Sequence, residues 1–216
     1  MIGRATTPVC DQGDPSPYTA LGVVAAIQAS LRATVGHDDL AGKRVAIQGV
    51  GNVGARLARL LAAEGAALLI ADTDARRAEH IAAELGAQVV DPAEILSIPC
   101  DVLAPCALGG AIDDRALPSL DCGIIAGATN EVLARPDLAD ALAARSILYV
   151  PDFCANAGGL VFLQGTLRGD DPSTIGERVL SVGQTVADVI DRSRVAGMTP
   201  LAAAVALAAE RLASAR

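Results

Sequence analysis

Three glycines at a fixed spacing stand between an apolar segment and a helical pattern. The segment Gly49-Val50-Gly51-Asn52-Val53-Gly54 follows the apolar run 44–48 and precedes a helix expected over 53–64. In such a motif the first glycine permits a tight turn, the second lets a pyrophosphate approach the backbone, and the third lets the helix pack closely. The N-terminus of the helix offers N–H groups and a partial positive charge to phosphates. The segment therefore predicts a dinucleotide-binding loop.

An acidic residue completes the pattern. Asp72 follows the apolar run 67–71 and stands 23 residues after Gly49 (72 − 49). A carboxylate at this place accepts the ribose hydroxyls of NAD and repels the 2′-phosphate of NADP, so NAD is the expected cofactor. Arg76 and Arg77 follow closely and leave tolerance of NADP open. The alternatives are an unrelated tight turn with a helix-capping aspartate, and a mononucleotide or adenosyl ligand.

The elements that must position this motif alternate along the chain. Strands are expected at 44–48, 67–71, 88–90, 101–104, 123–126 and 147–150, and helices at 17–35, 53–64, 74–85 and 136–144, with a brief helix opening at Asp91-Pro92. Ser16 and Pro17 fit the N-cap and first position of the first helix. Strands that are unbroken apolar runs indicate a parallel sheet covered on both faces. The pattern predicts an α/β doubly wound (Rossmann) fold with a mostly parallel sheet of about six strands.

Beyond Pro151 the pattern becomes wholly helical. Two apolar stripes at helical spacing are Ile175, Val179, Val182, Val186, Val189 and then Leu201, Val205, Ala208, Leu212. We expect a lead-in segment at 1–15, an NAD-binding domain at 16–198 and a C-terminal helix at 199–216. Apolar residues of 156–168 and 199–212 outnumber what one sheet face can cover, so we expect some of them exposed.

Composition excludes several classes of function. The chain has 216 residues, 52% of them apolar and 2% aromatic, and a net charge of −8, which is unlike a nucleic-acid binder. Five cysteines without C-x-x-C spacing and two histidines predict no metal site and no disulfide framework. We also expect no membrane span, because no apolar run reaches about 20 residues. The opening residues lack a signal core, so a cytoplasmic location is expected.

Four further segments carry a family resemblance: GDPSPYTALGV (13–23), CDVLAPCALGG (100–110), IIAGATNEVL (124–133) and PDFCANAGGL (151–160). With the glycine motif they resemble, in order and spacing, the cofactor-binding (C-terminal) domain of the Glu/Leu/Phe/Val amino-acid dehydrogenases. The leucine, valine and phenylalanine members look most similar. The resemblance covers roughly 13–212. It implies NAD-dependent oxidative deamination of a branched-chain or phenylalanine-like L-amino acid to a 2-oxo acid and ammonia.

The resemblance also implies roles for individual residues. Thr19 and the loop Cys106-Ala107 would lie near the nicotinamide, Asn130 on the ribose side, and Asn156 against the amino or keto group of the substrate. Structural alternatives stay open: Thr19 as an early-turn helix residue, Cys106 as a small buried apolar residue, and Asn156 as a helix N-cap. The family often has Asn-Asn-Gln-Leu where this chain has NEVL at 130–133, so the ribose contact differs in detail.

The resemblance further implies a half that these residues do not provide. Family members carry an N-terminal substrate domain with catalytic lysines, whereas the single lysine here, Lys43, begins the first strand. That edge of a parallel sheet is opposite the ligand crevice. We therefore expect no catalytic residue on this chain, and either self-association as a homo-oligomer or a separate substrate domain as partner. A non-catalytic NAD-binding module is the second interpretation.

Overall fold

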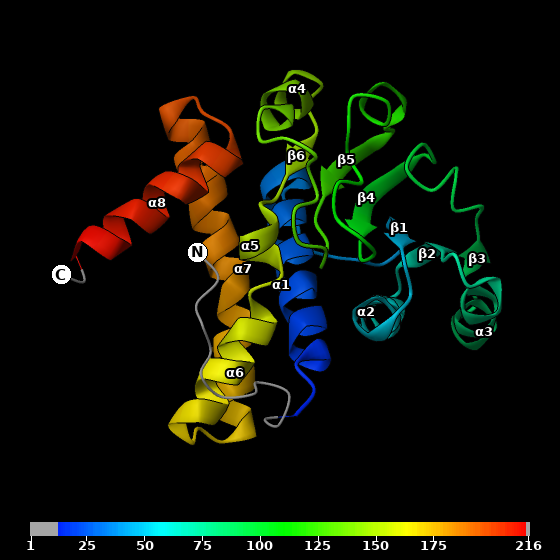
Figure 1. Ribbon diagram of the computed structural model, residues 1–216, viewed down its shortest axis with the longest axis horizontal. Coiled ribbons are helices and arrows are strands. Elements are labelled where there is room, and N and C mark those ends of the chain that lie inside the picture. The colour runs from blue at the N-terminus through cyan, green and yellow to red at the C-terminus, as the bar shows by residue number, and fades with distance from the viewer. Residues whose placement is uncertain (1–12, 215–216) are drawn as a thin grey trace.

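The computed structural model describes residues 13–214 and contains one six-stranded sheet (Figure 1). The strand order is β3-β2-β1-β4-β5-β6, and every paired strand is parallel to its neighbour. The strands are β1 (Arg44–Gln48), β2 (Ala67–Ala71), β3 (Gln88–Val89), β4 (Cys100–Pro105), β5 (Cys122–Ile125) and β6 (Leu148–Tyr149). The order reverses at β1, which pairs with both β2 and β4. Such a reversal leaves a crevice at the carboxyl ends of the strands. The predicted fold is confirmed.

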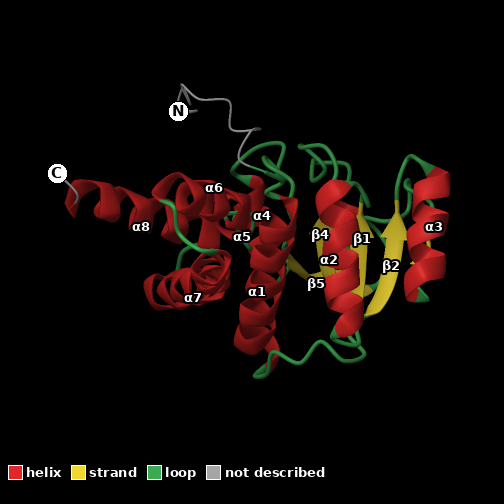
Figure 2. Ribbon diagram, turned by 90° about the horizontal axis from the view of Figure 1, so that it is seen from below, coloured by secondary structure: helices red, strands yellow, loops and turns green. Residues whose placement is uncertain are grey.

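Successive strand residues supply two separate cores, one on each face of the sheet. Val45 and Ile47 pack with α1 (Ser16–Val35), α2 (Asn52–Ala63) and α3 (Ala75–Leu85), which line one face (Figure 2). Ala46, with Leu69 and Leu103 beside it, packs on the other face. Loop residues, the short η2 (Leu117–Ser119) and α4 (Leu138–Ala144) cover that second face. The two apolar faces explain why the strands have unbroken apolar sequences.

The C-terminal third is helical, as expected: α5 (Asp152–Ala155), α6 (Gly158–Arg168), α7 (Pro172–Ala196) and α8 (Pro200–Ser214). The first three pack against α1, and α8 packs against α7. All five residues of the predicted α7 stripe are at most 5% exposed. On α8 only Ala203 and Ala204 are buried, and this helix leads away from the body of the molecule (Figure 1). Val205 and Leu212 of the predicted α8 stripe are 56% and 69% exposed. The expected exposure of apolar residues is therefore confirmed.

Two local predictions are wrong. Ser16 is the first residue of α1 rather than its N-cap, and the carboxylate of Asp14 accepts its amide at 2.9 Å. The segment opening at Asp91 forms hydrogen-bonded turns instead of a helix. The Asp91 side chain accepts the Ala93 amide at 2.8 Å, an aspartate turn that competes with helix formation.

Helix α1 is long and apolar enough to span a membrane by length and composition, contrary to the expectation from the sequence. Half of its most apolar 18-residue window is buried inside the protein. Its Ala20, Val23 and Ile27 are fully buried in the core that α1 shares with α2 and the sheet. The apolar character of α1 is thus accounted for by packing within the domain.

Glycines allow α1 and α6 to approach closely. A Cβ at Gly158 would overlap the carbonyl oxygen of Tyr18 and lie 3.2 Å from Val179. A Cβ at Gly22 would lie 3.3 Å from the Gly158 backbone. One turn further along α6, Phe162 stacks on Tyr18 with ring centroids 4.5 Å apart. This contact fixes the start of α6 against the start of α1.

We predict that Gly158→Ala destabilises the protein by about 1–3 kcal/mol, because the added methyl group meets backbone that has no space to yield. Gly176→Ala on α7 is the matched control, since a Cβ there meets no atom within 4 Å. Alanine is favoured over glycine in a helix by about 0.5–1 kcal/mol, so this control should be neutral or stabilising. Urea unfolding midpoints measure both. Equal midpoints for the two variants would show that the α1–α6 contact can relax.

Candidate functional site

The three glycines of the motif each have the geometry that their expected roles require. Gly49 has φ +93° and donates its amide to the Ala71 carbonyl at 2.7 Å. A Cβ at Gly54 would overlap the carbonyl oxygen of Gly49, so only glycine lets α2 sit this close to the turn. Around Gly51 the position of a Cβ has no neighbouring atom within 4 Å. That open space lies at the N-cap of α2, where a phosphate would meet unpaired N–H groups.

A cleft of about 370 Å³ opens beside this loop, at the carboxyl ends of β1, β2 and β4. Its lining consists of Gln48, Gly49, Gly51, Ala71, Asp72, Thr73, Arg77, Pro92, Cys106, Ala107 and Leu108. The cleft thus brings together five of the predicted site residues from three separate loops. The other motif residues surround it: Val50 is buried, and Asn52, Val53 and Gly54 form the first turn of α2.

Asp72 is fixed in place by backbone donors. Its two oxygens accept the Val50 amide at 2.8 Å and the Asp74 amide at 2.9 Å, and its side chain is 7% exposed. Burial alone would raise the pKa of this carboxyl. The Asp74 and Val50 amides and the Arg77 guanidinium outweigh that effect, and the pKa lies below the usual aspartate value. Asp72 therefore stays ionised at neutral pH as an oriented acceptor at the cleft.

The cleft residues fit a dinucleotide by their own geometry. The free space at Gly51 and the N–H groups at the N-terminus of α2 would accommodate the phosphates. The ionised carboxylate of Asp72 would accept hydrogen bonds from the ribose hydroxyls. These groups lie on the loops that follow β1 and β2. The loop after β4 closes the third side with Cys106 and Ala107.

Cys106 is a packing residue rather than a nucleophile. Burial raises the pKa of its thiol to about 12, so the reactive thiolate is absent at neutral pH. Its Cβ lies 3.2 Å from where a Cβ at Gly54 would be, and its amide donates to the Gln48 carbonyl at 2.7 Å. Cys106 is half-buried, packs against Gly54 and lines the cleft, and its position near a nicotinamide stays a prediction.

Asn156 and Asn130 meet although 26 residues separate them. The Asn156 amide nitrogen donates to the Asn130 side-chain oxygen at 2.7 Å and to the Ala128 carbonyl at 3.3 Å. Asn156 is the C-cap of α5, and α6 has Ala157 at its N-cap, so the N-cap interpretation of Asn156 is wrong. The predicted substrate residue and the predicted ribose-side residue thus belong to one hydrogen-bonded group.

Asp152 holds the loop that carries Asn130. One carboxylate oxygen of Asp152 accepts the amides of Glu131 and Val132, and the other accepts the Phe153 amide at 2.8 Å. Glu131 has φ +54°, a left-handed conformation that costs a non-glycine residue energy unless its surroundings enforce it. The Asp152 carboxylate supplies that enforcement.

Thr19 lies in the first turn of α1, and Lys43 lies directly before β1, as the sequence predicted. The Thr19 hydroxyl donates to the Pro15 carbonyl at 3.2 Å, as an early-turn helix residue does. It also touches α6, because a Cβ at Gly159 would overlap its oxygen. Lys43 directly precedes β1, so it lies at the edge of the sheet opposite the cleft.

Sequence reasoning did not name Gln48 as a residue of the cleft, and it named Arg77 only together with Arg76. The side-chain oxygen of Gln48 is buried and has no hydrogen-bond partner within the described residues. A polar residue that ends an apolar strand just before the glycine motif was a visible signal for it. Arg77 lines the cleft next to Asp72, whereas Arg76 does not.

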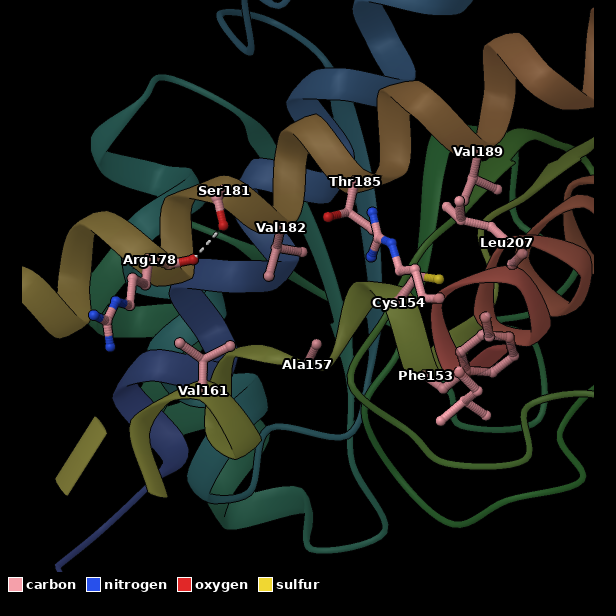
Figure 3. Close-up of a pocket in the computed structure, with 14 residues that line it drawn as sticks. Phe153, Cys154, Ala157, Val161, Arg178, Ser181, Val182, Thr185, Val189 and Leu207 are labelled. Atoms are coloured by element: carbon pink, nitrogen blue, oxygen red, sulfur yellow. Dashed lines mark hydrogen bonds between the residues drawn. The ribbon is translucent and has the colours of Figure 1, made fainter. Parts of the chain in front are cut away.

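A second hollow of about 480 Å³ lies among the C-terminal helices, away from the glycine loop (Figure 3). Val161 of α6, Val182 and Val189 of α7, and Leu207 of α8 point into it, beside Phe153. We call this hollow the helical groove. Its rim residues Phe153 and Leu212 are 47% and 69% exposed.

Comparison with known proteins places the chain in a family. The model of the glutamate/leucine/phenylalanine/valine dehydrogenases matches residues 14–76 and 67–164. Leucine dehydrogenase of Bacillus cereus is 40% identical over 202 residues, which are 94% of this chain and 55% of that protein. Valine dehydrogenase of Streptomyces virginiae is 37% identical over 207 residues, 94% of this chain and 58% of that protein. The chain therefore spans little more than half the length of these relatives.

Solved structures that resemble this chain are also amino-acid dehydrogenases. L-Tryptophan dehydrogenase from Nostoc punctiforme superposes with a TM-score of 0.91 at 37% identity, covering 94% of this chain and 62% of that one. A hetero-hexameric glutamate dehydrogenase from Thermus thermophilus gives a TM-score of 0.75 at 25% identity, covering 94% and 53%. With its glycine loop, its fold and these matches, the chain belongs to the glutamate/leucine/phenylalanine/valine dehydrogenase family.

Proposed function

We propose that this chain binds NAD in the cleft beside the glycine loop and forms the cofactor half of an amino-acid dehydrogenase. The reaction would be oxidative deamination of an L-amino acid to a 2-oxo acid and ammonia. One observation carries the proposal: Asp72, ionised and held by the Val50 amide, lines the same cleft as Gly51. The Cβ position of Gly51 has no neighbouring atom within 4 Å, which leaves space for a phosphate.

The proposal gives tasks to residues of the cleft and to three residues outside its lining, Thr19, Asn130 and Asn156. Asp72 accepts ribose hydroxyls, and the first turn of α2 with Gly51 receives the phosphates. Asn156 faces the substrate, because an amide accepts from an amine and donates to a carbonyl and so suits both ends of the reaction. When bound, NAD supplies the acceptor for the hydride. Thr19 and the loop of Cys106 and Ala107 would flank the nicotinamide, and Asn130 would lie on the ribose side, as the family resemblance implies.

An apolar amino acid is the substrate class we propose. The relatives are named leucine, valine and L-tryptophan dehydrogenases, and all of these amino acids have apolar side chains. Branched-chain or phenylalanine-like substrates therefore fit better than glutamate. The alternative is a non-catalytic NAD-binding module. It is favoured by one observation: the single lysine of the chain, Lys43, lies at the edge of the sheet away from the cleft.

The chain should bind NAD, and Asp72→Ala should weaken that binding by tenfold or more. Hydrogen bonds to a charged group contribute about 1.5–3 kcal/mol each, and this variant removes the acceptor for the ribose. Because the pKa of Asp72 is already low, binding by the native chain should be constant between about pH 6 and 8. Asp188→Ala on the exposed side of α7 is the control with the same charge change. Calorimetric titration measures all three, and folded native chain without NAD binding would overturn the proposal.

The 216-residue chain should not produce NADH from leucine, valine, phenylalanine or glutamate at a rate near those of its relatives. General acid–base catalysis contributes about 10²–10⁴-fold, and no lysine stands at the cleft to provide it. NADH absorbance over neutral to alkaline pH is the readout, and addition of a separately expressed substrate domain from a relative should raise the rate. Rapid turnover by the pure chain would show that one of its own residues transfers the proton.

We further propose that the helical groove is a partner surface, for a second copy of this chain or for a substrate domain. The groove is lined mainly by apolar residues, and Phe153 and Leu212 at it are exposed, as is typical of such surfaces. One structural neighbour is described as hetero-hexameric, which is consistent with assembly in the family.

Leu212→Glu should therefore weaken association, because it places a charge on the rim of the groove. Val89→Glu on β3, at the opposite end of the sheet, is the control, since Val89 is 43% exposed. Sedimentation velocity over a range of concentrations gives the assembly state, alone and with the substrate domain. The proposal would be contradicted if the native chain stayed monomeric both alone and with the substrate domain.

A further inference from the structure

Arg77 occupies a position in the cleft that the proposed binding of NAD leaves without a task. Its Nη1 lies 3.3 and 3.4 Å from the two carboxylate oxygens of Asp72, and its Nη2 lies 3.3 Å from Asp74. These separations are longer than the 2.7–2.9 Å of a strong charge-assisted hydrogen bond. The guanidinium therefore rests against Asp72 without being locked to it.

The two partners differ in how firmly they are held. The side chain of Asp72 is 7% exposed and bound by two backbone amides, whereas that of Arg77 is 48% exposed. A ligand that needs Asp72 can displace the guanidinium into solvent. A ligand that carries a phosphate at the same place can draw the guanidinium to itself, because its planar fork matches phosphate oxygens.

The start of α3 sets which arginine faces the cleft. Asp74 is the N-cap and accepts the Arg77 amide at 3.2 Å, which fixes the first turn of the helix. Consecutive helical residues point about 100° apart, so Arg76 and Arg77 cannot both face Asp72. Arg77 lines the cleft, and Arg76 forms no ion pair among residues 13–214.

We propose that Arg77 is a specificity-determining residue that narrows the discrimination between NAD and NADP. The inference rests on the proposed binding of NAD in this cleft. Asp72 repels the 2′-phosphate of NADP, and Arg77 offsets part of that repulsion while offering the phosphate a donor pair. The native chain binds NAD more tightly than NADP, and the size of the difference depends on Arg77.

The test compares NAD and NADP affinities by calorimetric titration at one fixed, low ionic strength. Arg77→Ala should weaken NADP binding about tenfold while NAD binding changes by less than threefold. Arg76→Ala is the matched control, because it removes the same charge one residue away from the cleft. This control should leave the ratio of the two affinities within about twofold of the native value.

A second comparison removes the opposing carboxylate. Asp72→Ser should bind NADP more tightly than the native chain does, and the double variant Asp72→Ser with Arg77→Ala should lose that gain. Circular dichroism shows whether each variant keeps its fold. Loss of the gain in the double variant supports the proposal, because a purely structural role of Arg77 would lower both affinities equally.

The outcomes separate this inference from the proposed function. A folded native chain that binds neither dinucleotide overturns the NAD proposal and the inference with it. A native chain that binds NAD, but whose NAD/NADP ratio is the same in Arg77→Ala as in Arg76→Ala, overturns the inference alone. So does a double variant that keeps the NADP affinity of Asp72→Ser.

Discussion

The hydrogen bond from the Val50 amide to the Asp72 carboxylate is the contact on which the site depends. It ties the turn after β1 to the end of β2, and so joins the glycine loop to the acid beside it. The turn itself exists because Gly49 adopts a positive φ and Gly54 leaves room for its carbonyl. A side chain at Gly54 would overlap the carbonyl oxygen of Gly49, and one at Gly49 would press on Cys106 and Ala107 of the loop after β4. Electrostatics then follows from packing: the fixed amides keep Asp72 ionised despite burial.

The second half of the site is organised by another carboxylate. Asp152 accepts the amides of Glu131 and Val132, and so holds the loop of Asn130 within reach of Asn156. Asp72 and Asp152 act in the same way, because the carboxylate of each accepts hydrogen bonds from backbone amides and so fixes a loop. A buried acceptor that is satisfied by backbone N–H groups is also protected from the energetic cost of desolvation. Both loops at the carboxyl edge of the sheet are thus held by side chain–backbone hydrogen bonds, and Arg77 adds a longer ion pair to Asp72.

The strands and the glycine loop could be predicted because their signals are local. An unbroken apolar run such as 67–71 defines a doubly covered strand, and the spacing from Gly49 to Asp72 defines the site. The pairing of Asn156 with Asn130 could not be predicted, because it depends on how two loops 26 residues apart meet above the sheet. The position of Ser16 shows the same limit on a smaller scale. A neighbouring carboxylate, Asp14, takes its amide, and helix propensity alone does not reveal that competition.

Polar chemistry is distributed unevenly over the sheet, and this distribution agrees with a division of tasks. The carboxyl edge presents Asp72, Arg77 and Asn156, which are groups suited to binding and orienting ligands. Lys43 stands at the opposite edge, where it cannot reach the cleft. At the helical groove, Phe153 of α5 and Leu212 of α8 remain exposed, whereas Val182 and Val189 of α7 are buried. The proposed binding of a cofactor at the carboxyl edge and the proposed association through the helical groove would use separate faces of the domain.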